Sequence, residues 1–180
     1  MEEVINLNLA CGNTRMTGFI GVDITPGERV DVVHDLKKPL PWKDETVSII
    51  FASHIIEHFW YHELDTILKD WCRVLKPKGK LDIWTPNFRM LIKLREAPDK
   101  VLNSAMLYMN WRIFNRDREP YDRHNCVLTQ RALSQKLIKV GFNKAFELTA
   151  DSYPVKRYVK LNGKNYERPD WEQFGMRAIK

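Results

Sequence analysis

The residue types that could carry chemistry follow the short apolar runs in the first half of the chain. Ala10-Cys11-Gly12 comes after the first run, Asp23 ends the second, His34-Asp35 follows the third and Ser53-His54 follows the fourth. Ligands of an open parallel sheet bind beyond the carboxyl ends of its strands, so we expect these groups to converge on one edge. Asp23 can accept from both hydroxyls of a ribose and Asp35 from an exocyclic amine, while Gly12, without a Cβ, allows close backbone approach. Together they favour a nucleoside, although each alone also fits an ordinary turn or a solvated strand end.

The run His54-Ile55-Ile56-Glu57-His58 offers three groups for acid–base chemistry. His54, Glu57 and His58 are candidate general bases. A transfer reaction needs a general base only if the group that accepts the transferred atom is a hydroxyl or a protonated amine. The run also matches the inverted zinc-protease pattern HxxEH, in which two histidines hold the metal and the glutamate acts as base. No third ligand is evident in the sequence and nothing else indicates a protease, so no metal is expected. Helix capping or packing is an equal alternative for both histidines.

A second cluster of polar groups lies between Asp117 and His124. Tyr121, Asp122 and His124 could line a pocket for the substrate. His124 is also a fourth candidate base. Arg123 could hold an anionic substrate, because a guanidinium matches the geometry of a carboxylate or phosphate. A solvated, charged loop is the simpler interpretation of the same run.

The elements that must position these groups alternate between strands and helices. Strands are expected over residues 4–10, 19–24, 30–34, 47–52, 81–85, 142–148 and 174–179. Helices are expected over 61–75, as one or two helices over 88–115, and from an N-cap at Thr129 to a stop at Gly141. This order predicts an α/β domain with a mostly parallel sheet.

Length and composition indicate one globular domain over residues 1–180. The chain is 44% hydrophobic and 29% charged, and it has no apolar run long enough to span a membrane. The start of the chain lacks the features of a signal peptide. Three widely spaced cysteines fit no disulfide framework, so a cytoplasmic location is expected.

The charge is unevenly distributed along the chain. Residues 1–60 carry five basic and nine acidic side chains, a net charge of −4, whereas the remainder carries 24 basic and 14 acidic side chains, a net charge of +10. This asymmetry indicates one cationic and one anionic ligand. The dinucleotide fingerprint GxGxxG is absent. A nucleoside that has no phosphate but carries a positive charge, such as the sulfonium S-adenosylmethionine, fits the acidic part.

Four spaced segments resemble motifs of class I S-adenosylmethionine-dependent methyltransferases, in particular the type 11/12-like methyltransferase domain. The segments are Leu7–Asn13 with Gly18–Asp23, His34–Leu36 with Pro39–Trp42, Ser53–His58, and Arg73–Gly79. Residues 129–142 match the family's late helix and turn more loosely. The resemblance implies a Rossmann-like, doubly wound sheet of about seven strands, one of them antiparallel.

The same resemblance implies S-adenosylmethionine as cofactor and transfer of its methyl group by in-line displacement. It divides the chain into a cofactor half over about residues 1–90 and an acceptor-side half over about 91–180. It also implies the cofactor contacts. They are Ala10, Cys11, Gly12, Asp23, Ile24, Asp35, Leu36, Ser53 and His54.

One departure from the family concerns the connection between the first two strands. Only about seven residues, Gly12 to Gly18, are left for a crossover that normally needs a dozen or more. The first helix must therefore be reduced to a turn, which leaves one side of the cofactor site less covered. A protein partner or a second copy of the chain could supply that cover.

Three hypotheses for function follow. A small-molecule or sugar-containing acceptor, anionic in keeping with the basic half, is favoured because no recognition module is appended. An RNA or DNA acceptor is the second, since the tail is basic and aromatic, but it carries no recognised nucleic-acid motif. A non-catalytic, partner-dependent cofactor-binding domain is the third.

Overall fold

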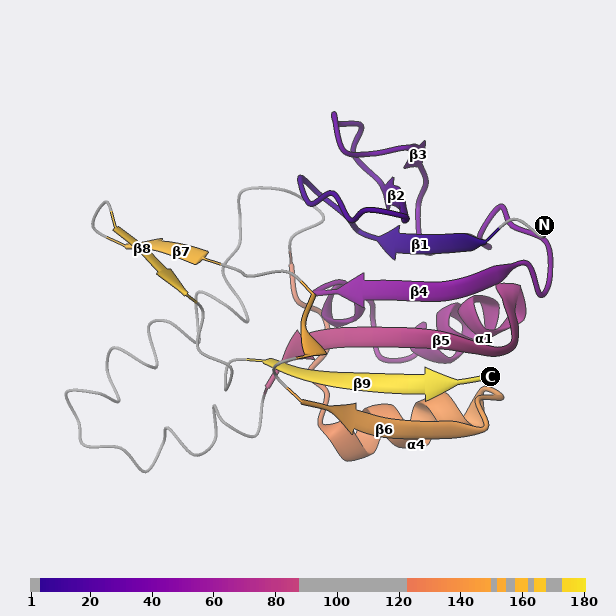
Figure 1. Cartoon of the computed structure of the whole chain (residues 1–180). Coiled ribbons are helices and arrows are strands. Elements are labelled where there is room, and N and C mark those ends of the chain that lie inside the picture. The colour runs from indigo at the N-terminus through magenta and orange to yellow at the C-terminus, as the bar shows by residue number, and fades with distance from the viewer. Residues whose placement is uncertain (1–3, 88–122, 150–151, 155–157, 162–163, 168–172) are drawn as a thin grey trace, which may run out of the picture.

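Seven strands form one sheet in the order β3-β2-β1-β4-β5-β9-β6 (Figure 1). The structure, a computed structural model, describes residues 4–87, 123–149, 152–154, 158–161, 164–167 and 173–180. The strands of the sheet are β1 Ile5–Leu9, β2 Ile20–Asp23, β3 Val32–Val33, β4 Val47–Ser53, β5 Leu75–Pro86, β6 Lys144–Leu148 and β9 Gln173–Ile179. β9 runs antiparallel to its neighbours and the pairs from β3 to β5 are parallel. The Rossmann-like, mostly parallel sheet of seven strands is confirmed.

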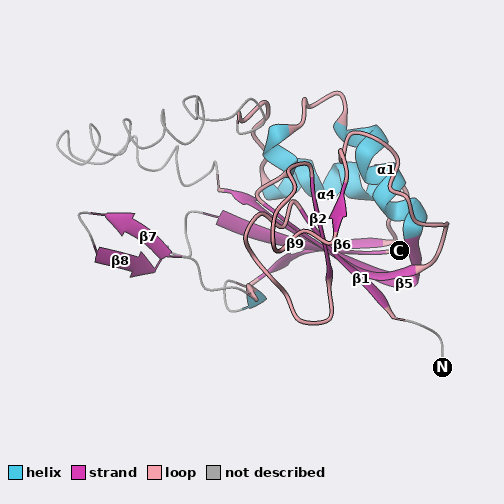
Figure 2. Cartoon of the chain, turned by 90° about the horizontal axis from the view of Figure 1, so that it is seen from above, coloured by secondary structure: helices cyan, strands magenta, loops and turns pink. Residues whose placement is uncertain are grey.

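The helices α1 (Leu64–Val74) and α4 (Gln130–Lys139) pack on the same face of this sheet (Figure 2). Their apolar stripes meet the alternate strand residues that point to that face. These include Leu7, Leu9, Ile50, Ala52, Leu81, Ile83, Met176 and Ala178. A short 3-10 helix, η1 (Ile56–His58), follows β4 and precedes α1.

The helix boundaries agree with the sequence signals. The side chain of Thr129 accepts a hydrogen bond from the backbone N–H of Ala132 and so caps α4 as predicted. None of the helices in the described residues has the length and apolar composition that crossing a membrane requires. The helices expected within 88–115 lie outside the described residues.

The connection between β1 and β2 contains no helix. Residues 10–19, all of which the structure describes, form turns and irregular chain, as the short crossover predicted. The backbone N–H of Cys11 donates to the carbonyl of Val22, and Thr14 N–H donates back to the carbonyl of Cys11. The chain thus turns directly from one strand into its parallel neighbour.

Two strand predictions differ from the structure in extent. β5 begins at Leu75 rather than near residue 81, because Leu75 pairs with Val47 before the register shifts. The third strand shrinks to Val32–Val33, paired with the end of β2. A hairpin of β7 (Tyr158–Leu161) and β8 (Lys164–Glu167), which the sequence did not predict, forms a separate two-stranded sheet.

Candidate functional site

A cavity of about 360 Å³ lies beyond the carboxyl ends of β1, β2 and β4. Residues from the strand ends and from the segment before α4 line it together. They are Ala10, Asp23, Ile24, Thr25, Asp35, Leu36, Lys37, His54, Ile55, His58, Phe59, Arg123 and Asn125. The predicted convergence of the strand ends therefore occurs, and it brings Asp23 and Asp35 to the same cavity as His54, His58 and Arg123.

Asp23, at the end of β2, is held by two backbone groups. Its Oδ2 accepts from Gly12 N–H at 2.9 Å and its Oδ1 accepts from Thr25 N–H at 3.1 Å. Gly12 has a φ of +50°, and apart from its two chain neighbours no described residue has an atom within 4 Å of the position its Cβ would occupy. Each carboxylate oxygen keeps a second lone pair that a ligand hydroxyl could use.

The segment after β3 provides a second acid and an apolar side chain. The Oδ1 of Asp35 accepts from Lys37 N–H at 3.0 Å, which fixes the turn that carries Leu36. Leu36 is buried, yet it lines the cavity. An acceptor oxygen beside an apolar wall suits a flat, amine-bearing ring.

Two residues that line the cavity adopt the left-handed backbone conformation, which is unfavourable for any residue that has a Cβ. Ala10 follows β1 with a φ of 54°, and His54 follows β4 with a φ of 55°. Such strained positions concentrate at functional sites, where surrounding contacts hold them. Both turn the chain sharply where the sheet edge meets the cavity.

His54 is bound on both sides of its ring. Its Nδ1 lies 3.0 Å from Oε1 of Glu57, and because a carboxylate only accepts, Nδ1 donates. Its Nε2 lies 2.9 Å from Oε1 of Gln173, which is the first residue of β9. Both ring nitrogens are therefore engaged within the protein, which suits a positioning role better than the transfer of a substrate proton.

Glu57 is the buried charge of the site. Burial by itself raises the pKa of its carboxyl group, but the hydrogen bond from His54 and the nearby imidazoles of His54, His58 and His124 outweigh burial and lower that pKa to about 2. The Oε2 also accepts from the hydroxyl of Thr85 at 3.0 Å. Glu57 is thus a stable carboxylate, not a proton acceptor at neutral pH.

The segment before α4 is tied to η1 by backbone contacts. Asn125 donates from its N–H to the carbonyl of Glu57 at 2.8 Å and from its side-chain amide to the carbonyl of His58 at 2.7 Å. The Nδ1 of His58 donates to the carbonyl of Arg123 at 3.1 Å. These bonds place Arg123 at the cavity and His124 beside His58.

Three predicted cofactor contacts do not line this cavity. The thiol of Cys11 is buried and lies 3.5 Å from the carbonyl of Arg29, and burial with the nearby Asp23 raises its pKa to about 11. Ser53 is also buried, and its hydroxyl bonds to that of Tyr153 at 2.9 Å. Gly12 is not among the lining residues either, but its backbone N–H donates to the carboxylate of Asp23, which lines the cavity. Tyr121 and Asp122 lie outside the described residues.

Several residues of the site were not predicted from the sequence. Thr85, the last residue but one of β5, donates to Glu57, and a survey of strand ends extended to β5 would have found it. Asn125 directly follows the predicted polar cluster. Gln173, the partner of His54, gave no signal because its contact spans 119 positions.

Comparison with known sequences points to one class of protein. A profile of the family described as "Methyltransferase domain" matches residues 7–83. The malonyl-[acyl-carrier protein] O-methyltransferase of Methylococcus capsulatus is 31% identical over 105 residues, which are 58% of this chain and 31% of that protein. The chain therefore spans about a third of the length of this curated relative.

Solved structures share the fold. A SAM-dependent methyltransferase from Archaeoglobus fulgidus aligns with a TM-score of 0.61 at 17% identity, over 98% of this chain and 86% of that one. A SAM-dependent methyltransferase from Methanosarcina mazei aligns with a TM-score of 0.56 at 15% identity, over 100% of this chain and 93% of that one.

Residues 7–83 match the methyltransferase domain family, and the chain shares the sheet order and fold of class I S-adenosylmethionine-dependent methyltransferases. The cofactor of this class is S-adenosylmethionine, and the residues of the cavity fit it. Asp23 presents a carboxylate that two backbone amides orient, the space above Gly12 is open, and Leu36 offers an apolar wall beside Asp35.

Proposed function

We propose that this protein transfers the methyl group of S-adenosylmethionine to a small-molecule or sugar-containing acceptor that carries a negative charge. The observation that supports it is the composition of the cavity, where Asp23 and Asp35 share one space with His58, Arg123 and Asn125. The bound cofactor supplies a sulfonium methyl group that is open to in-line attack. The protein supplies the alignment.

The two acids and the apolar wall would hold the nucleoside. Asp23 would accept from the ribose hydroxyls with the lone pairs that Gly12 and Thr25 leave unused. Asp35 would accept from the adenine amine, with Leu36 against the ring face. His54, held between Glu57 and Gln173, would fix the wall on the methyl-transfer side.

Arg123 supports an anionic acceptor. It is exposed and lines the cavity, where a guanidinium can bind a carboxylate through two hydrogen bonds. The net charge of +10 beyond residue 60 favours the same sign of ligand. The curated relative is named for O-methylation of malonyl-[acyl-carrier protein], and a malonyl group ends in a carboxylate.

Calorimetry with S-adenosylmethionine tests the cofactor assignment. Asp23→Ala is expected to weaken binding at least tenfold, because it removes hydrogen bonds to a charged group worth about 1.5–3 kcal/mol. Glu28→Ala, an exposed acid that does not line the cavity, is the matched control and should bind as wild type does. Absence of binding at millimolar cofactor, or equal binding by Asp23→Ala, would remove the assignment.

Transfer of a labelled methyl group to pairs of acceptors tests the charge of the substrate. Each carboxylate, including malonyl thioesters, is compared with its uncharged amide. Arg123→Ala should raise KM for the anionic member at least tenfold, whereas Arg131→Ala, which replaces an exposed arginine on α4, should not. Methylation of RNA with a steep salt dependence would contradict a small-molecule acceptor.

A further inference from the structure

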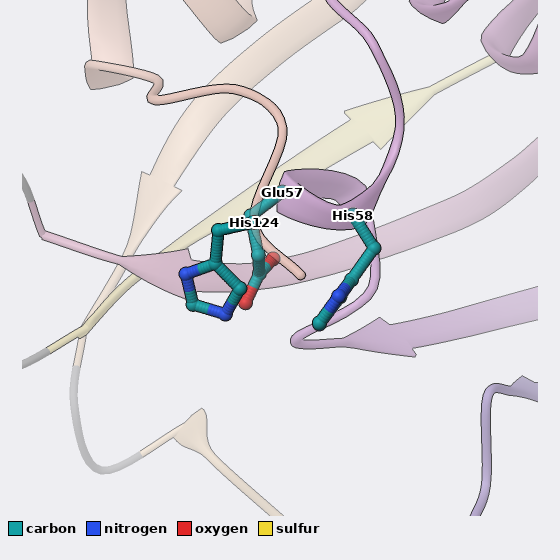
Figure 3. Close-up of side chains that lie close together, drawn as sticks. All are labelled: Glu57, His58 and His124. Carbon is teal, nitrogen blue, oxygen red and sulfur yellow. The ribbon is translucent and has the colours of Figure 1, made fainter. Parts of the chain in front are cut away.

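Three side chains that can ligate a metal meet beside the cavity, and one of them, His58, lines it. One ligand atom from each of Glu57, His58 and His124 lies within 4.8 Å of the others (Figure 3). Glu57 and His58 come from η1, and His124 comes from the segment that leads into α4. The cluster therefore joins parts of the chain that are distant in sequence.

Backbone hydrogen bonds hold the two contributing segments together. The carbonyl of Glu57 accepts from both Asn125 N–H and Cys126 N–H, at 2.8 and 3.1 Å. The carbonyl of His58 accepts from the amide of Asn125. The rings of His58 and His124 meet edge to face, with centroids 4.8 Å apart. The approach of His124 is thus built into the fold rather than left to a mobile side chain.

The hydrogen bond at His58 sets the ring for metal binding. Its Nδ1 faces the carbonyl of Arg123 at 3.1 Å, and because a carbonyl only accepts, Nδ1 carries the hydrogen. A neutral ring with this tautomer has its lone pair on Nε2. Histidines that bind metals are oriented in this way, by a carbonyl or carboxylate on the other nitrogen.

Glu57 supplies the charge that a cation requires. Its side chain is nearly completely buried, and its carboxylate accepts one hydrogen bond on each oxygen, from His54 and from Thr85. Each oxygen keeps a second lone pair. A ligating carboxylate is usually supported by outer hydrogen bonds of this kind.

We propose that Glu57, His58 and His124 form a binding site for one divalent transition-metal ion. Two imidazoles and one carboxylate suit ions such as Mn²⁺, Fe²⁺, Co²⁺ or Zn²⁺, whereas Mg²⁺ and Ca²⁺ prefer oxygen ligands throughout. Metal–ligand bonds of about 2.1 Å separate neighbouring ligand atoms by roughly 3 to 4 Å. Small rotations of the half-buried His58 and His124 close the present spacing of up to 4.8 Å.

This ligand set differs from the one that the HxxEH pattern of the sequence suggests. That pattern would pair His54 with His58, but both ring nitrogens of His54 are bound to Glu57 and Gln173. His124 takes the place of His54, and His54 becomes the outer partner of the glutamate. The third ligand, not evident in the sequence, comes from a segment 66 positions beyond His58.

Three protein ligands leave coordination positions open. His58 lines the cavity, so an oxygen of the acceptor could take one of these positions beside Arg123. Holding the acceptor in this way rests on the proposed function, whereas binding of the ion does not. The site then selects acceptors that present an oxygen ligand, such as a carboxylate or a hydroxyl.

Titration of the tag-free, full-length protein with Co²⁺, followed by visible absorption, tests the site without reference to activity. One equivalent should bind with a d–d band, and Zn²⁺ should displace it. His58→Ala and His124→Ala should each weaken binding at least tenfold. His62→Ala, which replaces an exposed histidine in the turn before α1, should leave binding unchanged.

Saturable binding that persists equally in His124→Ala, or no binding at millimolar Co²⁺, would overturn the proposal. Circular dichroism shows whether each variant is folded. If His58→Ala does not fold, His124→Ala, whose backbone contacts remain, decides the question. Binding of S-adenosylmethionine is measured separately, in the presence of a chelator that removes metal ions. Failure of the metal proposal therefore leaves cofactor binding intact, whereas failure of the proposed function abolishes it.

Discussion

Single residues at the ends of β1 and β4 shape the cavity through their backbone. Ala10 and His54 both hold a positive φ, which costs a residue with a Cβ about 1–2 kcal/mol. At His54 the bonds to Glu57 and Gln173 compensate, since they fix the ring that this conformation directs toward the site. Ala10 has no side-chain polar group to compensate, so its strain is open to direct measurement.

Ala10→Gly is expected to raise the free energy of unfolding by about 1 kcal/mol. Glycine adopts the positive φ without strain, and this gain exceeds its greater entropy in the unfolded chain. Urea denaturation measures the change. Ala132→Gly in α4 is the matched control and should lower the same free energy by about 1 kcal/mol, because glycine disfavours a helix interior. A loss of stability in both variants would contradict the strain at Ala10.

At the scale of elements, α1 anchors the loop that follows Asp35 and Leu36. Arg73 at the end of α1 donates to the carboxylates of Asp70 and Asp44 and to the carbonyls of Leu40 and Trp42. The carboxylate of Asp70 in turn accepts from Leu40 N–H at 2.7 Å. One side chain thus holds the path of the chain from the cavity to β4.

Arg73→Ala is expected to lower the free energy of unfolding by about 2 kcal/mol. The change leaves the carbonyls of Leu40 and Trp42 without their charged donor, and a lost hydrogen bond to a charged group costs about 1.5–3 kcal/mol. Lys69→Ala, on the exposed side of α1, should change stability by less than about 0.5 kcal/mol. Equal effects of the two variants in urea denaturation would rule out the anchoring role.

Across the whole molecule, ion pairs join the first half of the chain to the second half. Asp65 in α1 accepts from Lys136 and Lys139 of α4, both at 2.6 Å, and Lys136 also lies over the ring of Tyr61. The hydrogen bonds from the two lysines, and their charges, lower the pKa of Asp65 below its ordinary value of 3.8. The basic character of the second half is therefore used in part to hold the two halves together.

This contact makes stability depend on pH in a defined direction. Because the pKa of Asp65 is lower in the folded chain, its contribution is complete above pH 3.8 and is lost as the pH falls through the folded value. Asp65→Asn should be less stable than wild type by at most about 1 kcal/mol at pH 6, since the pair is partly exposed. Denaturation series at pH 6 and pH 3 should show this difference shrinking. A difference that stays constant or grows toward acid pH would contradict the ion pair.

The sequence predicted the fold because its signals are local. Short, nearly continuous apolar runs marked β1, β2 and β4, the cap at Thr129 marked α4, and the count of residues from Gly12 to Gly18 excluded a first helix. The predicted start of β5 and the predicted bounds of β3 differ from those in the structure. Pairing with a neighbouring strand, not the local sequence pattern, sets where a strand begins and ends.

The sequence by itself determined which polar groups lie at the strand ends. Because neighbouring parallel strands run in the same direction, their carboxyl ends lie at one edge of the sheet. Only the tertiary structure decided what those groups do. It paired the side chains of Cys11 and Ser53 with residues that do not line the cavity, bound both sides of the His54 ring, and set His124 beside Glu57. The physical reason is that a side chain beyond a strand end is oriented by its backbone conformation and by partners from distant segments, and neither is encoded in local periodicity.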